Sequence, residues 1–173
     1  MSSAAPAGEA GEFSEAEVLR LTADLKQRIL NGGTLGDFLA VSKADLEATY
    51  IIGSRLYEMG NYKEAAITLR KLVTLDPYER RYLQALAAAT QMMGNYEDAV
   101  GYYHLLLVLD AEDPMPTVHM AQCLIHLGRA QDAAIALEAT IDNATGKPAF
   151  AAISAQAQAM LTLIRQNNKV DAP

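Results

Sequence analysis

The sequence is poor in the features that mark several protein classes. Its 173 residues include a single cysteine, Cys123, so no disulfide can form within the chain, and a reducing compartment suits this composition. The 14 Lys and Arg residues are outnumbered by 21 Asp and Glu residues, which gives a net charge of −7. Proteins that bind phosphate backbones or anionic lipid need clustered positive charge, so we expect no direct binding to nucleic acid or membrane.

Long apolar runs are also missing. No stretch of 18 apolar residues occurs, so no transmembrane helix is expected. The N-terminus is rich in Ala, Gly, Ser and Pro, and it lacks the basic and apolar regions of a signal peptide. We therefore interpret residues 1–12 as a disordered tail and residues 167–173 as a frayed tail, and we expect a soluble, cytoplasmic protein.

Motifs for catalysis or cofactor binding are absent as well. Gly32-Gly33 is followed by Thr34 rather than by the Lys-Ser/Thr pair of a phosphate-binding loop, and no nucleophile elbow occurs. His119, Cys123 and His126 fall on one helical face, as a metal site would require, but no Asp, Glu or second Cys joins them at ligand spacing. Packing between helices is the better interpretation of His119 and Cys123, because a free cysteine behaves as a small buried apolar residue. The sequence thus predicts no enzyme, no metal and no cofactor.

What the sequence does contain is a repeat of 34 residues. Gly60, Gly94 and Gly128 share this spacing, and each is followed by an alanine five positions later and a large apolar residue nine positions later. A turn glycine, a small residue and a closing proline such as Pro77 at this period are the signature of the tetratricopeptide repeat, a pair of antiparallel helices. The glycine permits the left-handed backbone of the turn, and the alanine permits close approach of the two helices.

The predicted architecture is therefore all-α, a solenoid of three helical hairpins with a helix before it and a capping helix after it. The segments are an N-terminal helical region at 13–45, repeats at 46–79, 80–113 and 114–147, and a capping helix at 148–166.

The N-terminal region carries clear helix signals. Ser14 and Glu17 have the spacing of a capping box, Phe13 and Val18 can form the hydrophobic staple around it, and Ser42 caps the first repeat. One apolar stripe then runs along the predicted helix. Its residues are Val18, Leu21, Leu25 and Ile29.

The first helix of each repeat, helix A, lines the concave side of such a solenoid. Tyr50 and Tyr57 lie on the groove face, because Ile52 and its neighbours already fill the core positions, whereas Tyr62 and Tyr96 are expected mainly in the core. The mixture of aromatic, aliphatic and amide side chains suits an extended, partly apolar peptide. The Lys, Asn and Arg residues of a carboxylate clamp are absent. The predicted groove residues are Tyr50, Ser54, Tyr57, Gln84, Ala88, Gln91, Met92, Val118, Gln122 and Ile125, and the repeat pattern also turns Glu47, Glu58, Arg81, Met115 and His126 to this side.

Several runs of residues go beyond the generic repeat. They are Gly33-Thr34-Leu35, Leu75-Asp76-Pro77-Tyr78, Gln91-Met92-Met93-Gly94-Asn95-Tyr96 and His119-Met120-Ala121-Gln122-Cys123-Leu124. Through them the chain resembles, over roughly residues 28–142, the class II chaperones of bacterial type III secretion systems. Those chaperones serve the two hydrophobic translocator proteins.

This resemblance implies a bacterial, cytoplasmic chaperone that keeps translocators soluble and competent for secretion. It implies a groove that holds an extended segment of the kind Pro-x-Leu-x-x-Pro, with Tyr103 joining Tyr50 and Tyr57 as a groove aromatic, although packing in the core competes for Tyr103. It also implies a homodimer formed through the N-terminal helical region, which assigns dimerisation to Val18, Leu21, Leu25 and Ile29.

Two other functions stay open at this point. One is a tetratricopeptide adaptor that joins proteins in a stable assembly. The other is co-activation of an AraC-type transcription regulator by the client-free protein, in which case the regulator would contact the DNA.

Overall fold

The structure is a computed structural model that describes residues 14–170, with side chains described as far as residue 166. The predicted tail at 1–12 and the staple residue Phe13 lie outside the described residues. The chain divides into two compact units, residues 1–41 and 42–173.

The first unit contains α1 (Glu15–Leu30) and the short α2 (Leu35–Phe38). The predicted capping box is present at the start of α1, where the Ser14 hydroxyl accepts from the Glu17 amide and the Glu17 carboxylate accepts from the Ser14 amide. Gly32, which follows α1, has a φ of +79°, and Thr34 forms a second capping box with Asp37 at the start of α2. These local signals explain why α1 begins and ends where it does.

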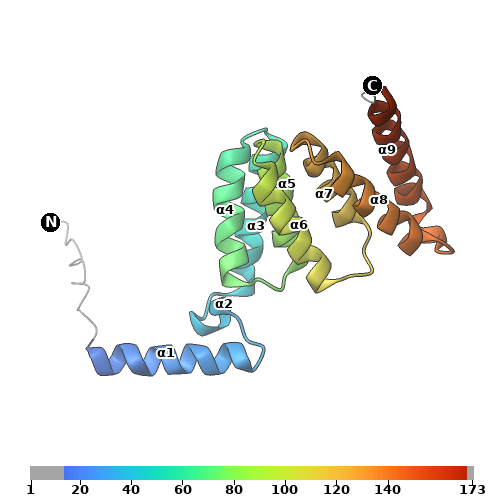
Figure 1. Ribbon diagram of the computed structural model, residues 1–173. Coiled ribbons are helices and arrows are strands. Elements are labelled where there is room, and N and C mark those ends of the chain that lie inside the picture. The colour runs from blue at the N-terminus through green and yellow to red at the C-terminus, as the bar shows by residue number, and fades with distance from the viewer. Residues whose placement is uncertain (1–13, 171–173) are drawn as a thin grey trace. The chain divides into compact units, whose positions relative to one another are not determined.

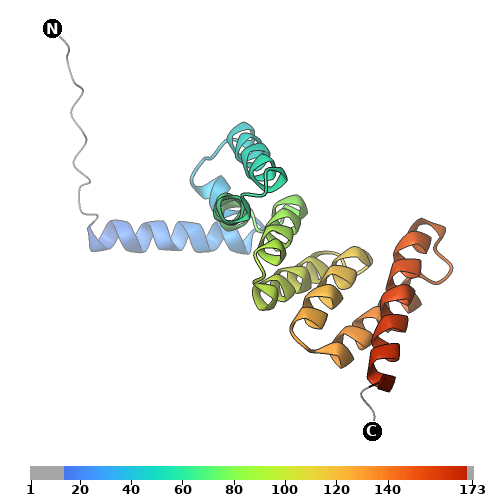
Figure 2. The same cartoon turned by 90° about the horizontal axis from the view of Figure 1, so that it is seen from above.

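The second unit is a row of antiparallel helix pairs followed by one more helix (Figures 1 and 2). Each helix packs chiefly on the helix before and after it in the sequence, as in a solenoid. No strand occurs within residues 14–170, so the all-α prediction is confirmed for the part that the structure describes. The helices are α3 (Lys43–Glu58), α4 (Tyr62–Leu75), α5 (Arg80–Met92), α6 (Tyr96–Leu109), α7 (Met115–His126), α8 (Ala130–Ala144) and α9 (Ala151–Val170), with a 3₁₀ turn at Pro148–Phe150 before α9.

The three repeat glycines adopt the backbone that the sequence predicts. Gly60, Gly94 and Gly128 have φ angles of +80°, +78° and +73°. In the second turn the Asn95 amide donates to the Thr90 carbonyl and the Gly94 amide donates to the Gln91 carbonyl, which is a Schellman motif. The same pair of hydrogen bonds closes α3 and α7, so each helix A ends in one turn geometry.

Small residues allow the paired helices to approach. Ala65, Ala99 and Ala133 are fully buried, as predicted. In the first pair α3 lies close to α4 at Gly53, where a Cβ atom would lie 2.9 Å from the Leu69 side chain. The prediction that Ile52 fills a core position is wrong, since Ile52 is 56% exposed. Gly53 is the position that faces α4, and Ile52 lies about 100° around the helix from it.

The core continues from repeat to repeat and ends under α9. Ala157, Leu161 and Ile164 of α9 pack on a cluster of α7 and α8 residues that includes Val118 and Leu137. The last helix therefore covers the end of the third pair, as a terminal helix of a solenoid must. Within residues 14–170 no helix is both long enough and apolar enough to span a bilayer.

We expect Gly94→Ala to destabilise the fold by about 1–2 kcal/mol, because an alanine at a φ of +78° adopts the left-handed conformation at a steric cost. Urea unfolding followed by circular dichroism measures this difference. Gly101→Ala is the matched control, because Gly101 lies within α6 and a Cβ there meets nothing within 4 Å. This second variant should be about 0.5–1 kcal/mol more stable than the parent. Equal stability of the two variants would contradict the assigned role of the turn glycine.

Candidate peptide-binding groove

A cavity of about 390 Å³ lies between α3 and α5, the helix A elements of the first two repeats. We call it the α3–α5 pocket. Five of the predicted groove residues line it, together with Glu58 and Arg81, which the repeat pattern also placed on this side. The lining residues are Tyr50, Ser54, Tyr57 and Glu58 of α3, and Arg81, Gln84, Ala85 and Ala88 of α5.

One lining residue, Ala85, is not among the predicted groove residues. It lies three residues before Ala88 and therefore on the same face of α5, so the i, i+3 rule could have found it. Two larger cavities, of about 590 Å³ at the junction of α8 and α9 and about 540 Å³ between α6, α7 and α8, contain no predicted groove residue. The α3–α5 pocket is the cavity that matches the expected groove.

Each pocket tyrosine is supported from behind by another tyrosine. The Tyr50 ring lies 5.4 Å from the Tyr82 ring at 42°, and the Tyr57 ring lies 5.3 Å from the Tyr62 ring at 62°. Tilted and edge-to-face pairs of this kind stabilise aromatic rings beyond their burial. Tyr50 and Tyr57 are half-buried, so one side of each ring remains open to the pocket.

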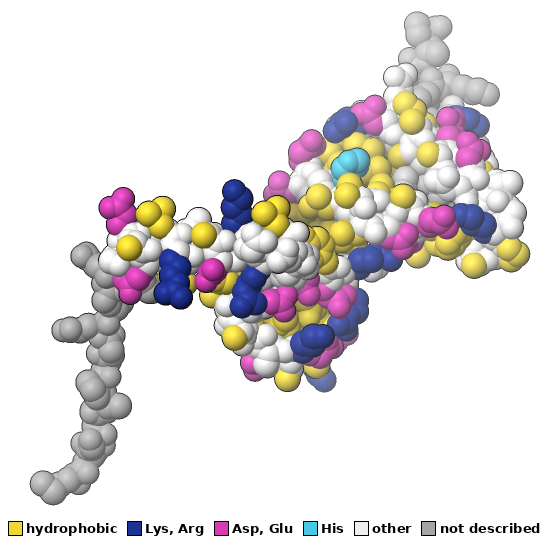
Figure 3. All heavy atoms as spheres, turned by 90° about the horizontal axis from the view of Figure 1, so that it is seen from below, with side chains coloured by type: hydrophobic (Ala, Val, Ile, Leu, Met, Phe, Trp, Pro, Cys, Tyr) yellow, Lys and Arg dark blue, Asp and Glu magenta, His cyan; other side chains and the backbone are white. Residues whose placement is uncertain are grey.

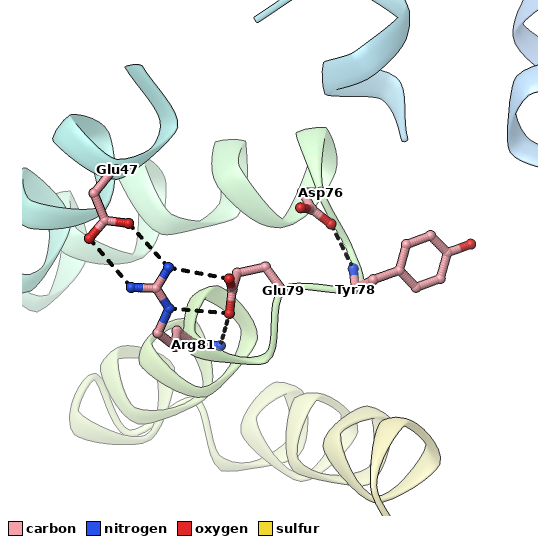
Figure 4. A network of polar contacts seen from close by, with 5 residues as sticks. All are labelled: Glu47, Asp76, Tyr78, Glu79 and Arg81. Atoms are coloured by element: carbon pink, nitrogen blue, oxygen red, sulfur yellow. Dashed lines mark hydrogen bonds and ion pairs between the residues drawn. The ribbon is translucent and has the colours of Figure 1, made fainter. Parts of the chain in front are cut away.

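Arg81 lines the pocket beside Tyr50 and lies between the carboxylates of Glu47 and Glu79, as Figure 4 shows for the two carboxylates. The Arg81 guanidinium lies 5.1 Å from the centre of the Tyr50 ring, and its Nη2 atom lies 3.1 Å from Glu47 and 3.2 Å from Glu79. The hydrogen bond from Arg81 lowers the pKa of Glu79, so this carboxylate stays ionised. Two carboxylates thus hold one cation over the Tyr50 ring, a cation–π arrangement that orients the wall of the pocket.

A hydrogen-bonded chain continues from α5 to α7. The Tyr103 hydroxyl donates to Gln91 Oε1 at 2.6 Å, and Gln91 Nε2 donates to Gln122 Oε1 at 3.2 Å. His119 Nδ1 lies 3.3 Å from the same Gln122 oxygen, and the His119 ring stacks on Tyr103 with centroids 5.4 Å apart. Two predicted groove residues on neighbouring helices are therefore tied together by side-chain amides.

The structure places two predicted groove residues in the core. Val118 is fully buried because it shares a face of α7 with Ala121 and Leu124, which packs on α8 and α9. Only 2% of Tyr103 is exposed, so its ring is a core element and only its hydroxyl takes part in the polar chain. Met92 and Ile125, by contrast, are exposed.

His119, Cys123 and His126, which the sequence placed on one helical face, contact aromatic rings or the core. The His126 ring stacks on Tyr96 with centroids 4.4 Å apart, and His119 stacks on Tyr103. Cys123 is fully buried in the core, as predicted, and burial raises the pKa of its thiol to about 11. No group of three His, Cys, Asp or Glu residues able to hold a metal ion occurs in the described part of the chain.

The predicted dimerisation stripe lies on the open surface of α1. No residue of α1 is buried, and apolar side chains are interspersed with charged ones along the helix (Figure 3). Val18, Leu21 and Ile29 are 49%, 42% and 48% exposed, and Leu25 is half-buried. The helix therefore carries an apolar face that its own unit leaves uncovered.

Comparisons with known proteins agree with the repeat fold. A family model described as "Tetratricopeptide repeat" matches residues 82–113. The chain is similar to the "Low calcium response locus protein H" of Yersinia pseudotuberculosis, with 29% identity over 140 residues that cover 81% of this chain and 83% of the relative.

Solved structures show the same similarity. A type III secretion system complex from Aeromonas hydrophila has a TM-score of 0.78 and 29% identity, covering 86% of this chain and 99% of that chain. The translocator chaperone SycD of Yersinia enterocolitica, crystallised with a peptide of the translocator YopD, has a TM-score of 0.68 and 30% identity, covering 74% of this chain and 98% of that chain. SycD has also been crystallised in an alternative dimer.

We predict that Cys123 of the folded protein reacts slowly with a thiol reagent such as DTNB at pH 8. Its side chain is fully buried, and a pKa of about 11 leaves about one hundredth of the thiolate of a free cysteine. The absorbance of released thionitrobenzoate measures the rate, and the same protein in urea, where Cys123 is exposed, is the control. Rapid stoichiometric labelling of the folded protein would contradict the burial of Cys123.

Proposed function

The chain belongs to the tetratricopeptide-repeat family of type III secretion translocator chaperones, and on this basis we propose that its helix A surface binds an extended segment of a hydrophobic translocator. The observation that carries the proposal is the α3–α5 pocket with its two supported tyrosines. The support from relatives is that the similar chaperone SycD was crystallised with a translocator peptide.

The proposed mechanism is physical rather than chemical. A cavity of about 390 Å³ is at the small end of ligand pockets, so it suits one or two apolar side chains of an extended chain rather than a folded domain. Occupying an aggregation-prone segment lowers the concentration of free apolar chain, and the segment must be released again before export. An affinity between micromolar and nanomolar, about −8 to −12 kcal/mol, serves both needs.

The proposal also covers the cellular location of the protein and its lack of catalytic activity. We place the protein in the bacterial cytoplasm, where an unexported translocator needs protection, and we assign it no catalytic step. Both statements are supported by membership of the chaperone family.

Co-expression of the chain with the proteins encoded beside its gene tests this function. We expect co-purification with a protein that has long apolar segments, and limited proteolysis of the complex should leave one short translocator fragment bound. Identification of that fragment by mass spectrometry defines the peptide used in the experiments below. A stable complex without any such apolar protein would contradict the proposal and favour an adaptor.

We expect Tyr57→Ala to weaken binding of the protected translocator peptide by about 1–3 kcal/mol, because tyrosines that wall a pocket carry much of the binding free energy at interfaces. Isothermal titration calorimetry measures the change. Tyr78→Ala is the matched control, since Tyr78 is 54% exposed and its ring points away from the Arg81 cluster (Figure 4). Unchanged affinity of a folded Tyr57→Ala protein would remove Tyr57 from the binding surface.

We also propose that the apolar stripe of α1 forms a homodimer. Leu21→Glu should shift the protein toward the monomer, because a charge on the stripe opposes burial against a second copy. Sedimentation velocity measures the mass. Ala23→Glu is the control with the same added charge, since at about 100° per residue Ala23 lies on the side of α1 opposite the stripe. Equal masses of the two variants and the parent would contradict a dimer through this face.

A further inference from the structure

We infer that Gln122 offers its side-chain amide N–H groups to a backbone carbonyl oxygen of the bound segment, and that the buried Tyr103 is the residue that fixes this orientation. The inference rests on the proposed function, and it adds how the backbone of the guest is recognised. Its basis is the hydrogen-bonded chain from Tyr103 through Gln91 to Gln122.

The series of hydrogen bonds has a direction, and its first donor is the Tyr103 hydroxyl. Burial raises the pKa of the Tyr103 hydroxyl, so the group keeps its proton and can donate it. It donates to Gln91 Oε1 at 2.6 Å, and this bond turns Gln91 Nε2 toward α7. Gln91 Nε2 then donates to Gln122 Oε1 at 3.2 Å. Tyr103 thus sets the orientation of the Gln91 amide, and Gln91 sets the orientation of the Gln122 amide.

His119 lies beside the same Gln122 oxygen and can match this orientation. Its Nδ1 atom lies 3.3 Å from Gln122 Oε1, and whether this nitrogen donates or accepts depends on the tautomer of the ring. In the tautomer with Nδ1 protonated, Gln122 Oε1 accepts from both Gln91 and His119. A flipped Gln122 amide would place its N–H groups against the N–H groups of Gln91 Nε2, so the contact with Gln91 favours a single orientation of Gln122.

The other end of the Gln122 amide is unused. Its Nε2 atom makes no hydrogen bond to another described residue, although it carries two N–H groups. Among the described residues, the one buried side-chain nitrogen or oxygen without a partner is Arg80 Nε, so Gln122 Nε2 is accessible to solvent. The network therefore leaves two oriented donors open to an acceptor from outside.

The repeat places these donors on the guest-binding side. Gln122 occupies the position of helix A that Ser54 and Ala88 occupy in the first two repeats, and both of those residues line the α3–α5 pocket. Gln91 likewise occupies the position of Tyr57. An extended chain presents backbone carbonyl oxygens at about 3.3 Å per residue, and one that continues from the pocket toward α7 needs donors there.

The Gln122→Glu variant tests the role of the outward N–H groups while keeping the hydrogen bonds of the internal network. A carboxylate keeps an oxygen for Gln91 and His119 but has no N–H groups, so the thermal midpoint should be retained while affinity for the protected translocator peptide falls about tenfold or more. Gln122→Met removes the donors without adding charge and should also weaken binding. Calorimetry measures the affinities. If both folded variants bind as tightly as the parent, the inference is overturned.

Tyr103→Phe tests the positioning role. The ring still fills the core, but Gln91 loses its donor, so we expect a loss of affinity of about threefold to tenfold. The ¹H–¹⁵N signals of the Gln122 side-chain amide should change in this variant before any peptide is added, which a purely structural role of Tyr103 would not cause. Tyr96→Phe is the matched control, because the Tyr96 ring also stacks on a histidine but its hydroxyl makes no hydrogen bond to another described residue.

The outcomes also distinguish this inference from the proposed function. If the parent protein does not bind the translocator peptide, the proposed function fails and the inference fails with it. If the parent binds, while the Gln122 variants keep full affinity and Tyr103→Phe leaves the Gln122 amide signals unchanged, only the inference fails.

Discussion

A helix that packs chiefly on its two neighbours in the sequence leaves one of its faces uncovered, and the function of this chain depends on that constraint. Helix A of each repeat packs on its own helix B, and in the second and third repeats it also packs on helix B of the preceding repeat. On the side of helix A that faces away from these contacts, neighbouring A helices meet only through side chains such as the Arg81–Glu47 ion pair and the Gln91–Gln122 hydrogen bond. In α3 and α5 this side forms the α3–α5 pocket, so the binding surface follows directly from the repeat.

An open apolar surface must also keep its shape in water. The Tyr50 ring is held by Tyr82 behind it and by the Arg81 guanidinium at its side, and Arg81 is itself held by Glu47 and Glu79. At the other end of the surface, side-chain amides rather than rings are oriented by partners beneath them. In both places a buried or paired group fixes an exposed one, which lowers the entropy lost when a guest binds.

The sequence alone predicts the repeat, and the helix face on which a residue lies, better than it predicts how deeply that residue is buried. The 34-residue period locates the turns. Tyr50 and Tyr57 line one pocket, as predicted, because residues seven apart lie on the same face of a helix. The repeat pattern assigns Val118 to the groove, although α8 and α9 cover this residue. The residues of helix A alone do not reveal where the neighbouring helices pack. The contact of Tyr103 with Gln91, and through it Gln122, joins three different helices, so no local pattern reveals it.

The central claim is that the uncovered side of the helix A elements holds an extended segment of a translocator. A crystal structure of the chain with the protease-protected translocator fragment tests it most directly. The account predicts an extended peptide along α3, α5 and α7 with an apolar side chain between Tyr50 and Tyr57. A peptide bound instead across the outer surface of α4, α6 and α8, with the α3–α5 pocket empty, would contradict it.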